Sequence, residues 1–366
     1  MTAHVLAACR SPVAPRGGAL SAYSLPQLGA PVLRAALAQA GLPPDAVDEV
    51  IVSTAIGPGG NPARSIALAA GLPEHVAGLS IDRQCSGGMD ALLLARALVE
   101  SGAANVVVAG GVESYSRAPI RQHTFADGRP PRPYTQAPFT PWPDRDPDMA
   151  EAADALAQRL GIDRPTQDEW AVESHAEARH CVPDPAEMIP FEGLAVDSFT
   201  RKLTPALCAR APTIHGSITH ANAAVAADAA AFCIVTSAKV AARHGTPGLR
   251  ILGGATRGAD PTCPGLAPLA AIQSAFAETG LTVDQIDVAE VMEAYAVQAI
   301  ACVREAGLDP ARVNLGGGAL ARGHPIGASG AINVVRLFHE LRHRGGTGLA
   351  TIAAAGGIGS ALILGA

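Results

Sequence analysis

The chain has 366 residues, of which 48% are hydrophobic and 4% aromatic, and its formal net charge is −6. The length exceeds what one hydrophobic core usually holds, which favours two domains or a duplicated one, and the acidic balance argues against nucleic-acid binding. The chain shows neither a signal peptide nor a membrane-length apolar span. Its seven cysteines form neither a disulfide framework nor a metal-binding pair. We therefore expect a cytoplasmic, metal-free protein without nucleic-acid or membrane partners.

Apolar strand-like runs alternate with helical runs along most of the chain. A helix is predicted over about 28–41, followed by a buried strand at 51–55. A second helix over about 85–101 is followed by a parallel strand that we expect to stop at Gly110-Gly111. This alternation predicts an α/β fold with layers of helices and a mostly parallel sheet.

Residues of about 117–200 interrupt this pattern. Prolines are dense at 130–143, where neither a helix nor a central strand can continue, and a helical stretch follows at about 149–180. We interpret the segment as an inserted loop domain lying over a site, because substrate-recognition segments commonly occupy such positions. A surface excursion without function is the alternative.

The chain also repeats itself. Residues 36–48 have a similar counterpart at 275–287, and Ser86-Gly87 before one long helix recurs as Ser329-Gly330 before another, 243 residues later. Each of these helices leads into an apolar strand that we expect to end in Gly-Gly. Several matches in register predict two similar halves rather than a solenoid. We place the halves at residues 1–245, including the insertion, and 246–366.

Two side chains in these segments could carry chemistry. Cys85 opens the helix of about 85–101, where backbone N–H groups and the helix dipole favour a thiolate, and small residues follow it. His324 stands between a glycine and a proline before a second helix, and an imidazole is the natural partner for such a thiol. The pair indicates an enzyme that forms acyl-thioesters, although a structural cysteine is the commoner case for this residue type. Glu293 could orient the histidine or simply cap a turn.

These segments together resemble the thiolases, of the acetyl-CoA acyltransferase type. The matching stretches span nearly the whole chain and are residues 8–12, 60–64, 82–88, 110–114, 167–171, 318–330 and the closing glycine-rich strand. The resemblance implies a five-layered αβαβα fold of two βαβαβαββ halves, with the loop domain receiving coenzyme A. It also implies a homodimer or homotetramer that has no bound cofactor and uses a coenzyme A thioester as substrate. In that family the counterpart of Cys85 takes the acyl group, and that of His324 activates it and helps to bind the thioester oxygen.

The chain departs from the family pattern at two chemically important positions. An asparagine that positions a water in an oxyanion hole is here Met292, and a thioether donates no hydrogen bond. The second cysteine, which removes the α-proton of the incoming acyl-CoA, is here Ala353. A methyl group cannot act as a general base.

The region that contacts coenzyme A also departs from the pattern. A Thr-Ala-Gly-Asn-Ala-Ser motif appears as residues 219–224 and a His-Met-Gly motif as residues 148–150, which adds His220 and Asp148 to this region. We expect the pantetheine to be contacted by His220, Ala224, Met149 and Tyr295. The donor could be an acyl-CoA or a carrier-protein thioester.

Three functions fit these residues. The first is a divergent thiolase that makes or breaks 3-oxoacyl thioesters through an acyl group on Cys85, with His324 or another group such as His220 as base. The second is a thioester enzyme that avoids proton abstraction, either by decarboxylative condensation or by acyl transfer to an oxygen or nitrogen acceptor. The third is a non-catalytic thiolase-like subunit that binds acyl groups or supports a partner.

Overall fold

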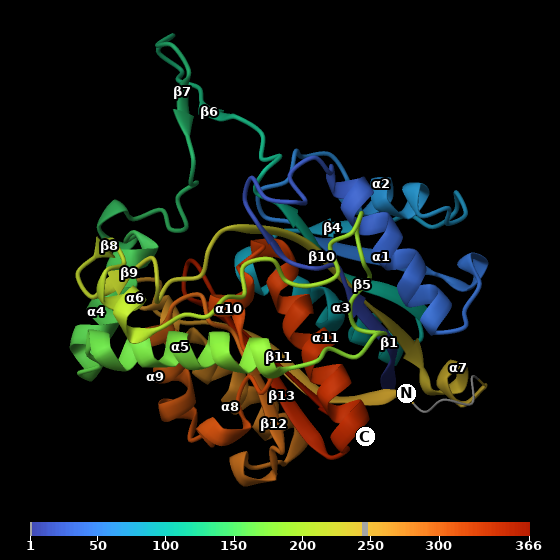
Figure 1. The fold of residues 1–366 in the computed structure, drawn as a ribbon. Coiled ribbons are helices and arrows are strands. Elements are labelled where there is room, and N and C mark those ends of the chain that lie inside the picture. Colours follow the sequence, from blue (N-terminus) through green and yellow to red (C-terminus); the bar gives the residue numbers. More distant parts are fainter. Residues whose placement is uncertain (1, 244–247) are drawn as a thin grey trace.

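Two similar α/β halves and one insertion make up the computed structural model, which describes residues 2–243 and 248–366 (Figure 1). The division that we expect between residues 245 and 246 lies outside the described residues and stays a prediction. The chain leaves the first half after β5 (Val106–Ser114) and re-enters it at β10 (Ala227–Ser237). The inserted segment therefore continues beyond residue 200.

The first half follows the expected βαβαβαββ order. Its remaining elements are β1 (Ala3–Arg10), β2 (Ala14–Pro15), α1 (Leu25–Gln39), β3 (Glu49–Ser53), α2 (Pro62–Ala69), β4 (Leu79–Ile81), α3 (Gly87–Ser101) and α7 (Ala238–Arg243). The predicted helix before residue 51 and the strand after it are both present. The second predicted helix begins at Gly87, because residues 84–86 form a 3-10 turn.

The second half repeats this order with one strand fewer. Its elements are β11 (Leu249–Gly258), α8 (Ala267–Thr279), β12 (Val288–Val291), α9 (Ala296–Ala306), α10 (Ala319–Arg322), α11 (Ile326–Arg344), β13 (Thr347–Ala354) and β14 (Ile358–Gly365). The counterpart of β4 is reduced to a bridge between Ala289 and Val313. Asn314, at a positive φ of 50°, turns the chain away, and its side chain bonds the backbone N–H and carbonyl of Val291 in place of a continued ladder.

The main sheet is mixed, so the prediction of a mostly parallel sheet was wrong. Its order is β12-β13-β14-β11-β1-β10-β5-β3-β4, and among these pairs only β12–β13, β3–β5 and β3–β4 are parallel. Parallel pairing needs a long crossover, which helices supply at those strands. The last two strands of the second half are instead joined by a short turn and pair antiparallel.

The helices divide the protein into five layers. The outer helices α1 and α2 pack on the strands of the first half, and α8 and α9 pack on those of the second (Figure 1). The helices α3 and α11 form the middle layer, in one buried core with strands of both halves. The side chains of this core are mostly alanine, valine, leucine and isoleucine, with Phe338 as an aromatic exception, so helices and strands approach closely.

Glycines allow the closest approach within the middle layer. A Cβ atom on Gly88 of α3 would lie 2.7 Å from the Ala331 backbone nitrogen, and one on Gly330 of α11 would lie 2.6 Å from that of Met89. Both distances are shorter than a Cβ atom tolerates. The N-terminal turns of the two helices therefore touch backbone to backbone.

The strand β5 does not stop at Gly110-Gly111, contrary to the prediction. It runs on to Ser114, and a Cβ atom on Gly111 would lie 2.0 Å from the carbonyl oxygen of Gly327 at the start of α11. Glycine serves close approach here rather than termination. In the second half the strand β13 does end just before Gly356, which has a φ of +76°.

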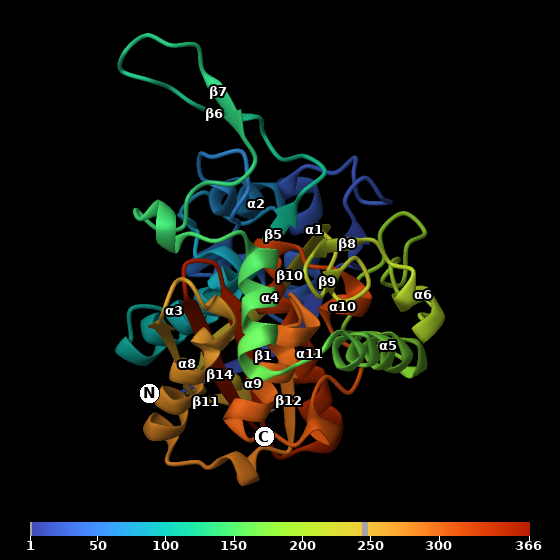
Figure 2. The same ribbon diagram turned by 90° about the vertical axis from the view of Figure 1, so that its left-hand side faces the viewer.

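The insertion has two parts. A hairpin of β6 (Arg121–His123) and β7 (Arg132–Tyr134) projects away from the rest of the protein (Figures 1 and 2). The second part packs against α9 and consists of α4 (Met149–Leu160), α5 (Arg164–His180), α6 (Pro205–Ala209), β8 (Thr213–His215) and β9 (Ile218–Thr219). It shares a buried core with α9, and this core forms one side of the site described below.

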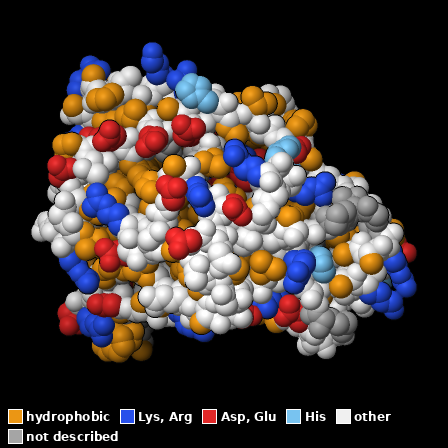
Figure 3. Space-filling model, turned by 90° about the horizontal axis from the view of Figure 1, so that it is seen from below, with side chains coloured by type: hydrophobic (Ala, Val, Ile, Leu, Met, Phe, Trp, Pro, Cys, Tyr) orange, Lys and Arg blue, Asp and Glu red, His pale blue; other side chains and the backbone are white. Residues whose placement is uncertain are grey.

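Basic and acidic side chains are intermingled on the face seen from below (Figure 3). The described residues on that face therefore form no continuous basic surface. Among the described residues, none of the helices combines the length and the apolar character that crossing a lipid bilayer requires.

Candidate active site

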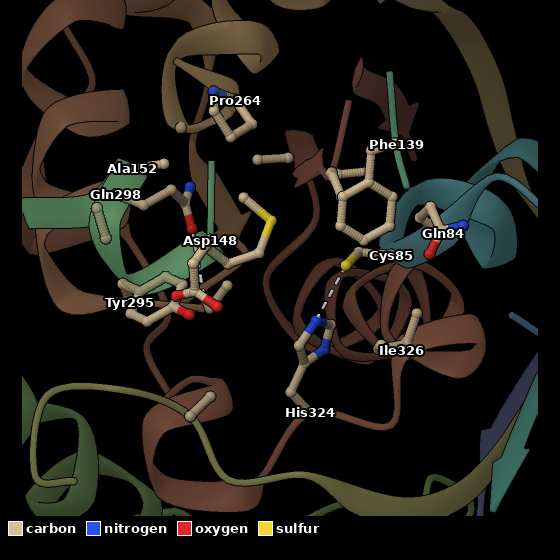
Figure 4. Close-up of a pocket in the computed structure, with 18 of the residues that line it drawn as sticks. Gln84, Cys85, Phe139, Asp148, Ala152, Pro264, Tyr295, Gln298, His324 and Ile326 are labelled. Atoms are coloured by element: carbon tan, nitrogen blue, oxygen red, sulfur yellow. Dashed lines mark hydrogen bonds between the residues drawn. The ribbon is translucent and has the colours of Figure 1, made fainter. Parts of the chain in front are cut away.

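The side chains of Cys85 and His324 meet between the two halves of the fold. His324 Nε2 lies 3.1 Å from Cys85 Sγ (Figure 4). Cys85 is in the 3-10 turn that precedes α3, and Gln84 before it adopts a positive φ of 51°. The carboxylate of Asp82 accepts a hydrogen bond from the Gln84 N–H and holds this strained turn. The two sequence-predicted chemical groups are thus within contact distance.

The position and tautomer of His324 are fixed by its neighbours. Its backbone N–H donates to the Val225 carbonyl, and its Nδ1 lies 2.7 Å from the hydroxyl oxygen of Ser329. That hydroxyl donates its proton to the Pro325 carbonyl at 3.1 Å. Since a hydroxyl has a single proton, Ser329 must accept a hydrogen bond from Nδ1–H. The lone pair of Nε2 therefore faces the sulfur, as a general base requires.

Burial sets the resting protonation of the pair. It raises the pKa of the Cys85 thiol to about 12, although hydrogen bonds from the backbone N–H groups of Ala355 and Cys85 favour the thiolate. Burial also lowers the pKa of His324 to about 4. At neutral pH the pair is a thiol beside a neutral imidazole. The expectation of an already ionised thiol is not met, because desolvation outweighs the field of the helix terminus.

A cavity of about 310 Å³ opens onto this pair. Three of the four residues expected to contact pantetheine line it, namely Met149, Ala224 and Tyr295. Ala353 lines it as well, so the position of the missing base faces the reacting groups. Figure 4 shows Phe139 beside Cys85 on one side of the cavity and Asp148, Tyr295 and Gln298 on the other.

Two sequence-predicted residues lie elsewhere. His220 is exposed and is not among the residues lining the cavity, so the structure does not support it as a base. Glu293 is buried and does not contact His324; its carboxylate accepts hydrogen bonds from Trp170, Ser174, Asn314 and the Leu320 backbone. It joins α5 to the loop before α10. These contacts tie the segments around the site together, and none of them orients the histidine.

Met292 is also outside the cavity. It is 1% exposed and belongs to the central core. A methionine is compatible with that position because it is surrounded by apolar side chains. The loss of the family asparagine thus removes a donor and leaves a packed core residue in its place.

Sequence reasoning gave no role to several lining residues. Gln298 lies in the first turn of α9, three residues after Tyr295, which is the N-cap of that helix. Phe139 lies in the proline-rich part of the insertion, where no periodic pattern points to a site. Ser329 belonged to a recognised motif, yet its hydroxyl bond to the imidazole depends on the local fold and could not be seen in the sequence.

A cysteine–histidine pair, backbone donors at the sulfur and a largely apolar cavity are the features expected of an acyltransferase of the α/β class. In the described part of the chain, no group of three or more His, Cys, Asp or Glu side chains is arranged to hold a metal ion.

Comparisons with known proteins identify the family. Residues 3–239 match the thiolase N-terminal domain and residues 246–366 the thiolase C-terminal domain. A Bacillus subtilis (strain 168) protein, provisionally named acetyl-CoA C-acetyltransferase YhfS, is 38% identical over 99% of both chains. The crystal structure of the Bacillus anthracis acetyl-CoA acetyltransferase has a TM-score of 0.90 and 34% identity, and covers 100% of this chain and 98% of its own. That of human mitochondrial 3-ketoacyl-CoA thiolase has a TM-score of 0.91 and 29% identity, with the same coverage. The chain belongs to the thiolase family.

Proposed function

We propose that the protein is a thiolase-like acyltransferase that carries the acyl group on Cys85 and makes or breaks 3-oxoacyl-CoA. The observation that carries this proposal is the 3.1 Å contact between Cys85 Sγ and the unprotonated nitrogen of His324. Relatives named acetyl-CoA acetyltransferase support a coenzyme A thioester as the substrate. They also favour this function over decarboxylative condensation, transfer to an oxygen or nitrogen acceptor, and a non-catalytic subunit.

The first half-reaction uses the neutral pair directly. As Sγ attacks the thioester carbonyl, its proton passes to His324 Nε2, and a C–S bond forms to give a tetrahedral intermediate. The backbone N–H groups of Cys85 and Ala355, which already face the sulfur, are placed to stabilise the oxyanion. The bond to coenzyme A then breaks, and the leaving thiolate takes the proton back from Nε2. Cys85 is left acylated and His324 neutral.

The second half-reaction needs a base for the α-proton of the second acyl-CoA. With alanine at position 353, His324 is the imidazole among the described residues that line the cavity. We assign it this proton as well. The carbanion attacks the acyl carbonyl, the bond to Cys85 breaks, and the thiolate recovers the proton from His324. A dedicated general base contributes about 10²–10⁴-fold, so condensation is expected to be slower than acylation.

Mass spectrometry of the intact protein after incubation with acetyl-CoA tests this function. We expect one added acetyl group, located on the peptide that contains Cys85 and absent in Cys85→Ala. Cys181→Ser is the matched control, since this partly buried thiol lies outside the cavity and its loss should leave the adduct unchanged. No adduct with acetyl-, butanoyl- or hexanoyl-CoA would overturn the proposal.

We also propose that the protein is a homodimer or homotetramer and that it is located in the cytoplasm. The strand β4 ends the sheet, and Leu79 on it is 44% exposed, which favours covering by a second copy in a homodimer or homotetramer. Light scattering on the purified protein tests this directly. The seven cysteines are free, which supports a reducing compartment such as the cytoplasm.

A further inference from the structure

One end of the cavity is a buried pocket. It is lined by Ala152, Ala153 and Leu156 of α4, by Pro264 and Gly265 of the second half, and by Gln298 of α9. The three α4 side chains are each no more than 6% exposed. The cavity is open where Gln136 lines it, since this residue is exposed. A pantetheine chain must lead out to its nucleotide, so it leaves through the open end. The buried pocket is left for the acyl group.

Gln298 is the polar side chain in this otherwise apolar pocket. It is 3% exposed, and its Oε1 accepts a hydrogen bond from the Ala294 N–H at 3.3 Å. Its Nε2 is buried and has no hydrogen-bond partner among the described residues. The bond to Ala294 fixes which way the amide points, because the backbone N–H needs an oxygen opposite it. Burying an N–H donor without a hydrogen-bond partner costs free energy. The unpaired Gln298 amide therefore indicates a missing hydrogen-bond acceptor.

The chemistry of the wall narrows the choice of acceptor. Asp148 lines the same cavity, and its Oδ1 accepts the Ala150 N–H at the start of α4. A negatively charged acyl group would be repelled by this carboxylate. A hydrocarbon would leave Nε2 unpaired. An uncharged oxygen, in a hydroxyl or keto group, accepts from Nε2 and meets no like charge.

We propose that Gln298 selects acyl groups that carry a hydroxyl or keto oxygen remote from the thioester. Figure 4 shows Gln298 on the side of the cavity opposite Cys85, so this oxygen is distinct from the carbonyl under attack. The inference rests on the proposed function, because it assumes that the acyl group occupies the cavity while bound to coenzyme A or to Cys85. It makes the enzyme specific for oxygenated acyl chains rather than plain ones.

Acylation rates of Cys85 with matched thioesters test this selectivity. The probes are hexanoyl-CoA and 5-hydroxyhexanoyl-CoA, with butanoyl-CoA and 3-hydroxybutanoyl-CoA as a shorter pair. In at least one of these two pairs, we expect the oxygenated thioester to have a kcat/KM for acylation about tenfold higher than that of the plain thioester. A tenfold ratio corresponds to one hydrogen bond to a buried donor. Gln298→Met keeps the length of the side chain, removes the donor and should abolish this preference. Gln136→Met is the matched control, since it removes the same amide from the exposed end and should leave the preference intact.

Each outcome bears on a separate claim. If Cys85 is acylated at similar rates by plain and oxygenated chains, the inference is wrong while the proposed function stands. If Gln298→Met slows all thioesters equally, the amide acts on pantetheine or on folding, and the inference is again wrong. If no thioester acylates Cys85, the proposed function itself fails. A preference that disappears only in Gln298→Met supports the inference.

Discussion

Restoring a thiol at position 353 should restore a general base. Ala353 is the penultimate residue of β13, is 7% exposed and lines the cavity that contains Cys85 and His324. Its cross-strand partner is Gly359, so no side chain opposes it on β14. Ala353→Cys adds one sulfur atom toward a cavity of about 310 Å³, and little strain is expected.

The size of the gain follows from the environment of the new thiol. A well-placed general base contributes about 10²–10⁴-fold, but burial in this cavity raises the pKa of the Cys85 thiol to about 12 and should act on a second thiol in the same way. Only a small fraction would be thiolate at pH 8. We therefore expect Ala353→Cys to increase α-proton removal by about 10- to 100-fold, at or below the lower limit of that range.

Exchange of the α-protons of acetyl-CoA with D₂O measures this step without requiring complete turnover. Ala353→Ser is the matched control, because a hydroxyl of similar size is too weak an acid to supply the base. Adding Met292→Asn should give no further gain, since Met292 lies in the central core and does not line the cavity. If Ala353→Cys exchanges no faster than Ala353→Ser, the absence of a base does not limit the reaction and the assignment of this position is wrong.

Three further predictions concern the pair and its support. Ser329→Ala should slow acylation of Cys85 by roughly 10-fold or more, because the imidazole loses the partner that fixes its tautomer. Ser329→Thr keeps the hydroxyl and should retain the rate. Equal acylation rates of Ser329→Ala and the unchanged protein in single-turnover assays would exclude this role of the hydroxyl. The rate of Cys85 acylation should be constant above about pH 5 and should decline as the pH falls through about 4, where His324 becomes protonated. A decline centred near pH 6.5 would contradict the lowered pKa of His324. Glu187 is buried between Arg10 and Arg336, whose charges outweigh desolvation and lower its pKa to about 2. Its carboxylate therefore stabilises the fold at neutral pH, and this contribution fades as the pH falls from 4.5 toward 2. Glu187→Gln should destabilise the protein by about 3–5 kcal/mol at pH 7 in urea unfolding, with a smaller difference in acid; an equal cost at pH 3 would refute this explanation.

The duplication and the catalytic pair could be predicted because they depend on local patterns. Cys85 precedes an apolar helix and His324 is held by a glycine and a proline, and neither feature needs knowledge of distant contacts. The family comparisons confirm the class of protein and the fold. The roles of the two side chains stay predictions, and the structure adds that they lie in contact.

The errors arose where distant segments decide the outcome. The protonation of Cys85 depends on how completely the cavity is enclosed, and part of its wall comes from the insertion through Phe139 and Met149. Gly110-Gly111 reads as a strand end in the sequence, yet the start of α11 packs on it and the strand continues. Gln298 was missed because an amide on an apolar helix gives no periodic signal, and its unpaired nitrogen is visible only in three dimensions.

The contact between the nucleophile and the base depends on the packing of the two halves. Cys85 and His324 each stand just before a helix of the middle layer, and the N-terminal turns of α3 and α11 touch through Gly88 and Gly330. With the 243-residue offset of the repeat, however, the counterpart of Cys85 is Ala328 rather than His324. The duplicated halves thus supply two helix ends in close contact, and later divergence placed a thiol at one and an imidazole at a different position of the other. A chain that lacked either half would have one of these groups and no partner for it.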